Sequence, residues 1–519
     1  SFLSIFPSMS TSLYTTYKSK LNSTYRSSFN KIKSFIHFGC WNNLCNNNYT
    51  GFTDVVKKLK KYVINNNDIK MQFISVAGDN YYALKSNDGK VGDRNVKMGI
   101  DDTDKMNNLK GIGKISNKIN FVSSSDIKLG FNLLQSISDS VPIHVIYGNH
   151  DLEENSKFIA VESITCSQQR KNSVQDDDII VKNVSKYGTS KNDCQMLDDQ
   201  MQVVQDLDSQ NMTLKQQDYP FFSKDTFVCM IDTSIYTLDF NSECYNNNDQ
   251  STEINKQFNS VLTEFNTKKR NVKNIIIIGH HPITYEKEKE EKKGKEEKKE
   301  KEEKKGKEEK KEKEEKKGKE EKKKSGYGET SKKIKIKEDK TLPNYDFLLF
   351  FLKLKSETIK QSPNAKFIYL CADTHFYQYG FIKINCTSDE YTDMEITQVI
   401  AGTGGTTLDI IPLKYGKIIT KNIENKKTEY EIKSSIQQHG FVEIREKLPL
   451  DSRKSAPAVG IRRTPNYTPI GNGLEFRFHA VNAPSRISST RRKISSSRIS
   501  STRRKRSSRS APTRRKSAP

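Results

Sequence analysis

Short apolar runs alternate with longer amphipathic stretches along residues 31–285. Each run is rich in β-branched or aromatic residues and ends at a glycine or a polar turn, as buried strands do. These predicted strands are residues 35–38, 71–77, 143–147, 226–232 and 275–278. The amphipathic stretches between them predict helices at residues 54–62, 126–138 and 253–268. Strands and helices in alternation favour an α/β sandwich.

The same pattern resumes after a long charged segment. A helix is predicted at residues 345–355, and further strands are predicted at residues 367–371, 397–400, 440–444 and 474–479. We therefore expect one α/β domain in two parts, residues 31–285 and 341–481, with residues 286–340 inserted between them.

The inserted segment is almost pure glutamate and lysine over residues 286–324. Gly294, Gly306 and Gly318 mark a unit that recurs every twelve residues. The segment has no apolar seam, which excludes a coiled coil. Glutamate–lysine pairs could support a solvated helix, weakened at each glycine by about 1 kcal/mol. A solvated spacer is the simpler expectation.

The two ends of the chain differ in charge. Residues 1–30 are a polar lead-in without a basic stretch followed by an apolar one, so no secretory signal is expected. Residues 482–519 form a basic tail, in which residues 485–519 hold thirteen Arg or Lys and no Asp or Glu. This tail supplies more than half of the net charge of +24. It predicts non-specific binding to nucleic acid or to an acidic surface, or a disordered solubilising role.

The eight cysteines are scattered and show no disulfide framework. This spacing favours a reducing compartment, with a cytoplasmic, nuclear or virion-associated protein as the expectation. No apolar run reaches the roughly 18 residues that a membrane span needs, so no transmembrane segment is expected.

Four polar clusters come directly after predicted strands. They are Gly78-Asp79-Asn80-Tyr81-Tyr82, Gly148-Asn149-His150-Asp151, Gly279-His280-His281-Pro282 and Ala372-Asp373-Thr374-His375. Ligands of open α/β sheets bind beyond the carboxyl ends of the strands, where all four clusters are expected. Carboxylate, amide, phenol and imidazole groups suit hard or borderline metal ions. Each cluster alone is a weak signal, but four in series predict a metal site.

This series resembles the motifs of the calcineurin-like metallophosphoesterases, which run G-D-x-x-D/Y, G-N-H-D/E, G-H-x-P and G-H-x-H. The form Gly78 to Tyr82 is similar to that of the purple acid phosphatase branch. Ile231-Asp232-Thr233 and the glycine loop at residues 401–405 resemble further family segments. The resemblance covers residues 31–480 without the charged insertion. It implies a four-layer α/β/β/α sandwich around two metal ions of the Fe, Zn or Mn type.

The resemblance also implies roles for individual residues. Asp79 would bridge the two metals. Asn149 and His280 would bind one ion, and Tyr82 and His375 would bind the other.

Two catalytic roles are implied as well. His150 would lie over the leaving group, and Asp151 would orient it through a hydrogen bond. Asn42, Asn80 and His281 are further candidates for the pocket.

Two ligand positions depart from the family pattern. Cys40, in Gly39-Cys40-Trp41-Asn42, stands where a further family motif, D-x-H or D-x-G, has an aspartate, and Asp373 stands where G-H-x-H has its first histidine. A carboxylate is a good replacement ligand, whereas a thiolate binds zinc or iron well and magnesium or manganese poorly. Asn42 occupies the place of another ligand histidine, which purple acid phosphatases also lack and replace by the tyrosine.

Three functions remain open at this stage. The leading one is a metal-dependent phosphoesterase that hydrolyses phosphate esters, chiefly monoesters, by a metal-bridging hydroxide. A second is a catalytically impaired protein of the same fold, acting in binding or structure, whose basic tail contacts nucleic acid. A third is a nucleic-acid packaging protein, which rests on the tail alone. Simple repeats and abundant Asn and Lys suggest an AT-rich genome, and the motif variants resemble those of phosphoesterases from large DNA viruses.

Overall fold

A computed structural model describes most of the chain between residues 31 and 481. The described ranges are 31–43, 49–66, 68–87, 90–91, 94–99, 118–153, 158–166, 179–187, 194–207, 211–238, 240–267, 271–285, 345–386, 390–409, 418–423, 426–447 and 467–481. The predictions for residues 1–30, 286–340 and 482–519 lie outside these ranges.

The first sheet has seven strands in the order β10-β7-β2-β1-β18-β20-β19. Their bounds are β10 Met212–Leu214, β7 Ile143–Ile146, β2 Ile69–Ala77, β1 Ile32–Phe38, β18 Gly440–Glu446, β20 Leu474–Ala480 and β19 Thr468–Gly471. The four strands from β10 to β1 run parallel, and β18 joins β1 in the antiparallel sense. The parallel half therefore presents three polar strand ends at one edge.

The second sheet also has seven strands, in the order β11-β12-β13-β15-β14-β17-β16. Their bounds are β11 Thr226–Met230, β12 Asn274–Ile278, β13 Lys366–Cys371, β15 Met394–Ala401, β14 Tyr377–Asn385, β17 Lys426–Ile436 and β16 Ile418–Ile423. Again the first four strands run parallel, and the rest are antiparallel. All five residues of β12 are buried, as expected for a parallel strand covered on both faces.

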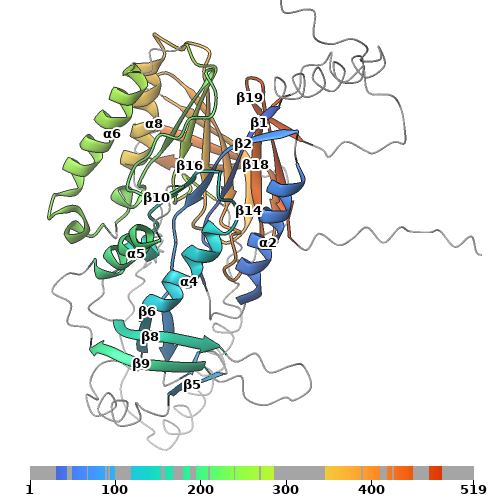
Figure 1. Cartoon of the computed structure of the whole chain (residues 1–519). Helices are drawn as coiled ribbons and strands as arrows, with labels where there is room; N and C mark the ends of the chain where they lie inside the picture. Colours follow the sequence, from blue (N-terminus) through green and yellow to red (C-terminus); the bar gives the residue numbers. More distant parts are fainter. Residues whose placement is uncertain are drawn as a thin grey trace, which may run out of the picture. The chain divides into compact units, whose positions relative to one another are not determined.

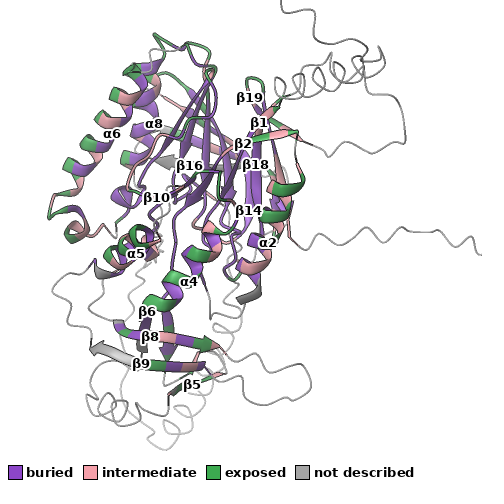
Figure 2. Ribbon diagram, in the orientation of Figure 1, coloured by how far each residue is buried: buried purple, intermediate pink, exposed green. Residues whose placement is uncertain are grey.

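One apolar cluster is shared by the two sheets. It joins Phe35 and Phe73 of the first sheet to Ile276, Leu370 and other residues of the second. The strands at the centre of the molecule are accordingly buried along most of their length (Figure 2). The two sheets thus bury their facing sides against each other, which excludes water from the space between them.

Helices cover the other faces of both sheets (Figure 1). Among the described residues there are five α-helices: α2 Tyr49–Asn65, α4 Ser124–Gln135, α5 Gln195–Asp206, α6 Gln250–Thr267 and α8 Tyr345–Thr358. Tyr62 of α2 packs edge-on against Phe441 of β18, with ring centroids 5.8 Å apart. In the second sheet, Phe265 of α6 packs on Phe227 at 5.3 Å. Aromatic contacts of this kind add to the burial of apolar area. The chain is therefore a mixed α/β protein, as predicted.

A small closed barrel was not foreseen. Its order is β3-β4-β5-β9-β8-β6. The strands are β3 Leu84–Asn87, β4 Lys90–Val91, β5 Arg94–Met98, β9 Ile179–Tyr187, β8 Phe158–Cys166 and β6 Lys118–Ser123. The sequence patterns predict none of these strands, because strands with one solvated face alternate apolar and polar residues and show no continuous apolar run. The barrel has a core of its own, which includes Val96, Phe121 and Val181.

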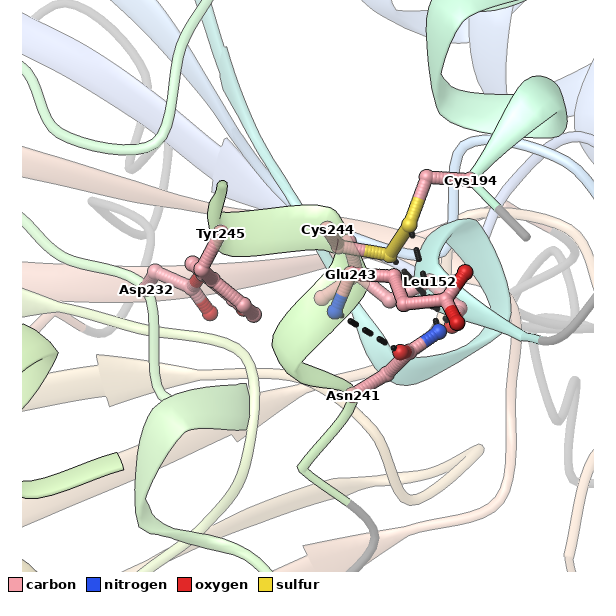
Figure 3. Close-up of a disulfide and its surroundings, with 7 residues drawn as sticks. All are labelled: Leu152, Cys194, Asp232, Asn241, Glu243, Cys244 and Tyr245. Atoms are coloured by element: carbon pink, nitrogen blue, oxygen red, sulfur yellow. Dashed lines mark hydrogen bonds between the residues drawn. A yellow bond between two sulfur atoms is a disulfide. The ribbon is translucent and has the colours of Figure 1, made fainter. Parts of the chain in front are cut away.

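A disulfide joins Cys194, which precedes α5, to Cys244 in the 3-10 turn η5 Ser242–Tyr245 (Figure 3). The two Cα atoms are 5.3 Å apart although 50 residues separate them in the chain. Cys166 is disulfide-bonded as well. The expectation of no disulfides was wrong, because the fold and not the spacing brings these thiols together. No helix in the described part of the chain is both long and apolar enough to span a membrane.

Candidate metal centre

The four predicted clusters and Cys40 gather at the carboxyl ends of five strands. The ends of β1, β2 and β7 belong to the first sheet, and those of β12 and β13 belong to the second. Backbone hydrogen bonds tie neighbouring loops together. The Cys40 amide donates to the Gly78 carbonyl at 3.1 Å, and the Ala372 amide donates to the His280 carbonyl at 2.8 Å. The parallel registers therefore deliver the polar loops to one place.

Three residues here hold a left-handed backbone. Cys40, Asp79 and Asp373 have φ angles of 55°, 53° and 54°. This region is unfavourable for residues with a side chain, at a cost of order 1–3 kcal/mol each. All three follow the ends of buried strands, and all three were predicted as metal ligands. Backbone strain of this kind concentrates at functional sites, where it places a side chain in a required position. The strain at these three residues therefore supports a functional role for their side chains.

Asp79 lies at the centre and points its two carboxylate oxygens to different neighbours. The Tyr82 hydroxyl donates to Oδ2 at 2.6 Å, and the Cys40 sulfur lies 3.7 Å from the same oxygen. On the other side, Oδ1 is 3.2 Å from Nε2 of His280 and accepts the backbone N–H of His150 at 3.2 Å. Burial raises the pKa of Asp79, but the charges of His280 and His150 outweigh burial and lower it. Asp79 is therefore a buried carboxylate shared by two groups of side chains.

The first group comprises Cys40, Asp79, Tyr82 and His375. Ligand atoms of Cys40, Asp79 and His375 all lie within 4.8 Å of one another. The Tyr82 hydroxyl is 3.2 Å from Nε2 of His375 and so belongs to the same group. Burial and the charge of Asp79 raise the pKa values of the Cys40 thiol and the Tyr82 phenol. A cation would reverse this effect, because coordination deprotonates thiols outright.

The second group comprises Asn149, His280, His281 and Asp373. Nε2 of His280 lies 2.9 Å from the Asn149 side-chain oxygen and 3.7 Å from an oxygen of Asp373. The other ring nitrogen, Nδ1, donates to the Ala77 carbonyl at 2.7 Å. Histidines that bind metals are held in this way, with one nitrogen fixed by an oxygen and the other turned to the site. Burial lowers the pKa of His280, yet Asp79 and Asp373 raise it to about 9.

His150 is held by Glu153 and not by Asp151. Nδ1 of His150 lies 2.5 Å from a carboxylate oxygen of Glu153, and Lys85 donates to that same oxygen at 3.2 Å. The His150 ring packs on Tyr82 with centroids 4.5 Å apart. Burial lowers the pKa of His150, but Asp79 and Glu153 raise it above its ordinary value. The orienting role predicted for Asp151 therefore falls to Glu153.

Asp151 instead holds the loops together. Its oxygens accept hydrogen bonds from the Gly148 amide at 2.7 Å, the Asn80 amide at 2.9 Å and the Gln200 side chain of α5 at 3.0 Å. Asn80 completes this network, since its side chain bonds Asp151, Trp41 and the Ile146 carbonyl. The pocket role predicted for Asn80 is thus replaced by a structural one.

Asn42 also lies away from the two groups. Its buried side chain packs against Gly130 of α4, where a methyl group would overlap the amide. Neither amide atom has a hydrogen-bond partner among the described residues. The predicted pocket role does not fit this position, because the side chain faces a helix and not the metal ligands.

The donor set suits metal ions. The described residues contain two groups that could hold an ion, one with Cys40, Asp79 and His375 and one with His280, His281 and Asp373. Thiolate, imidazole and carboxylate together favour zinc or iron over magnesium. The hydrogen bond from His280 Nδ1 to the Ala77 carbonyl and the contacts of both Asp79 oxygens also fit a metal site.

Two residues of the site are not predicted by the sequence patterns. Glu153 follows His150 by three residues in the 3-10 turn η2 Asn149–Leu152, and that spacing could have indicated the pair. Thr233 stands out in the sequence only as part of Ile231-Asp232-Thr233, which resembles a segment of the metallophosphoesterase family. Its hydroxyl accepts the backbone N–H groups of His280 at 3.1 Å and His281 at 2.9 Å, so it fixes the loop that carries both.

Comparisons with known proteins do not identify a family for this chain. No family model matches the chain, and no curated protein matches its sequence. One similar solved structure is described as "GAP50 the anchor in the inner membrane complex of Plasmodium". It is 10% identical, with a TM-score of 0.33 over 87% of this chain and 85% of that one. A likeness this distant carries no argument about function.

Proposed function

We propose that this protein is a metallophosphoesterase of the calcineurin-like type, similar to purple acid phosphatases, that hydrolyses phosphate monoesters at a dinuclear site. The observation that carries the proposal is the position of Asp79. One of its oxygens faces Cys40 and Tyr82, and the other faces His280. A single carboxylate between two ligand groups is what a pair of metals needs as a bridge.

The ligands would divide between the two ions by group. Cys40, Tyr82 and His375 would hold one, and Asn149, His280 and Asp373 would hold the other. Two bound ions of the Fe, Zn or Mn type would supply an activated water and neutralise phosphoryl charge. Within the chain, Asp79 keeps the two groups in register, and the buried setting strengthens every charge interaction.

His150 would serve the leaving group. Its side chain is 25% exposed, so it borders the open side of the site. Glu153 fixes Nδ1 and leaves Nε2 free to donate a proton to the departing alkoxide oxygen. The carboxylate of Glu153 also favours the protonated ring, which such a donor requires.

The finer fold assignment belongs to this proposal too. Two sheets that share a core, with α2 on one and α6 on the other, support a four-layer α/β/β/α sandwich of the metallophosphoesterase kind. The basic residues 485–519 would bind nucleic acid or an acidic surface. For location, the Cys194–Cys244 disulfide favours an oxidising compartment over the reducing one expected from cysteine spacing.

A second candidate is a protein of this fold that has lost turnover. Cys40 and Asp373 favour it, since each replaces a ligand of the family pattern. Such a protein would use its surface or its basic tail for binding.

Elemental analysis of chelator-free protein, with hydrolysis of p-nitrophenyl phosphate measured on the same sample, tests the proposal. We expect about two metal ions per chain and turnover that falls by about 1,000-fold in His150→Ala with metal content unchanged. The matched control His144→Ala, on β7 but outside the site, should keep both properties. No metal and no turnover after reconstitution with Fe, Zn and Mn would leave the second candidate.

A further inference from the structure

His281 is a buried histidine with one nitrogen left over. Its side chain has no exposed surface, and Nδ1 lies 2.9 Å from the Thr233 hydroxyl oxygen. Nε2 is buried and has no hydrogen-bond partner among the described residues. A buried polar atom without a partner costs about 1–3 kcal/mol. Such an atom calls for a ligand or an ion beside it.

The ring stands next to the second ligand group. A ring nitrogen of His281, a ring nitrogen of His280 and a carboxylate oxygen of Asp373 all lie within 4.8 Å of one another. The His280 and His281 rings are nearly perpendicular, with centroids 4.8 Å apart. Adjacent residues thus direct two imidazoles to one small volume that also contains a carboxylate.

The hydrogen bonds of His281 repeat those of His280. In His280, Nδ1 is tied to the Ala77 carbonyl and Nε2 faces the ligands. In His281, Nδ1 is tied to Thr233, and Tyr369 donates to the His281 carbonyl. Thr233 thus occupies Nδ1 of His281, and Nε2 is the ring nitrogen left to bind an ion.

We propose that Nε2 of His281 is a ligand of the metal ion in the second group. This deepens the proposed function and rests on it. Asp373 stands where the family pattern has an imidazole, and His281 restores one from the neighbouring loop. Nitrogen and oxygen donors then share that ion, which favours zinc or iron.

Zinc binding to the full chain tests this ligand directly. The variants are His281→Phe, which keeps the ring volume without nitrogen, and Thr233→Val, which removes the hydroxyl that contacts His281 Nδ1 and accepts the backbone N–H groups of His280 and His281. His144→Gln, at a partly buried histidine outside the group, is the matched control. Zinc affinities are measured by competition with a chromophoric chelator. Histidine-labelled protein reports the ¹⁵N shift of each imidazole nitrogen before and after zinc, and the His281→Phe spectrum identifies the His281 signals.

We expect wild type and His144→Gln to bind two zinc ions. His281→Phe should keep the first and bind the second about 100-fold more weakly, and Thr233→Val should weaken the second by about 10-fold. The Nε2 signal of His281 should move on zinc addition, and Nδ1 should be protonated in the zinc-bound chain. If His281→Phe does not fold, Thr233→Val and the wild-type spectrum decide.

Two results would overturn the assignment in different ways. Unchanged affinity for the second zinc, with a stationary Nε2 signal, removes His281 from the ligands and leaves the dinuclear site standing. A wild-type chain that binds no zinc, iron or manganese removes the proposed function and this ligand with it.

Discussion

The two ligand groups share Asp79 but differ in chemistry. The first offers a thiol, a phenol and an imidazole from Cys40, Tyr82 and His375, and the second offers imidazole, amide and carboxylate groups. Each group contains one departure from the family pattern. Cys40 replaces a hard oxygen by a soft sulfur, whereas Asp373 replaces a nitrogen by an oxygen. The sulfur of Cys40 narrows the choice of metal toward zinc or iron, whereas the oxygen of Asp373 leaves that choice broad.

The effect of a substitution at a ligand position therefore depends on which other donor groups lie beside it. Asp373 has His281 beside it, which can supply a nitrogen. Cys40 has Asp79 and Tyr82 within reach, and a cation would be needed to stabilise its thiolate in this buried place.

Asp79→Asn should have the largest effect. The amide keeps the shape but removes the charge shared by both groups, so we expect both ions to be lost and turnover to fall by at least about 1,000-fold. Elemental analysis and p-nitrophenyl phosphate hydrolysis measure the two effects. Asp218→Asn, a carboxylate bonded to His144, is the control. Retention of both metals in Asp79→Asn would contradict the shared role.

Cys40→Asp should make the two groups alike. With an oxygen ligand in the first group, we expect the preference for zinc over manganese at that ion to fall by about 100-fold, with the second ion unaffected. Competition titrations with both metals measure this preference. Cys371→Ser, at a buried thiol that bonds a backbone carbonyl, is the control for loss of a cysteine. A preference that does not move would show that Cys40 is not a ligand.

His37 and His280 are both fully buried, but burial acts on them with different results. Burial lowers the pKa of His37 to about 4, whereas carboxylates raise that of His280 to about 9. An unfolded chain takes up a proton near pH 6.5, and folded His37 does not until about pH 4. Stability should therefore fall as pH drops through this window, by roughly 3 kcal/mol in all.

Urea unfolding at pH 7.5 and 4.5, with chelator present, measures this loss. Because other groups titrate too, the test is the difference between wild type and His37→Gln. The variant should lose about 2.5 kcal/mol less than wild type between the two pH values. Equal losses would show that His37 is not responsible.

Glu153→Gln should have the smallest effect. The amide can still accept the Nδ1 hydrogen bond but no longer favours the protonated ring of His150. We expect kcat to fall by about 10-fold with KM and metal content unchanged, and the acid limb of activity to persist while the alkaline limb moves to lower pH. Glu357→Gln on the exposed side of α8 is the control. A change in KM alone would point to substrate binding by Glu153.

Strand prediction worked where both faces are buried. Runs such as residues 275–278 read plainly because parallel strands between a helix layer and a second sheet carry apolar side chains on both faces. The barrel strands β8 and β9 escaped notice because one face of each meets solvent. The Cys194–Cys244 disulfide escaped because a separation of 50 residues carries no spacing signal.

The sequence predicted which polar side chains gather after the strands but not the contacts that they make. Glu153 and not Asp151 holds His150, since the 3-10 turn places residue 153 over residue 150. The Asn42 side chain packs against Gly130 of α4. Neither outcome can be read from residue spacing alone.

The sequence by itself determined the mixed α/β class and the polar clusters after buried strands, because hydrophobic periodicity and strand-end glycines are local properties. Tertiary structure alone decided which oxygen of Asp79 faces which group, which carboxylate pairs with His150 and where the Nε2 of His281 lies. Those relations depend on strand order and register across two sheets, which join residues hundreds of positions apart.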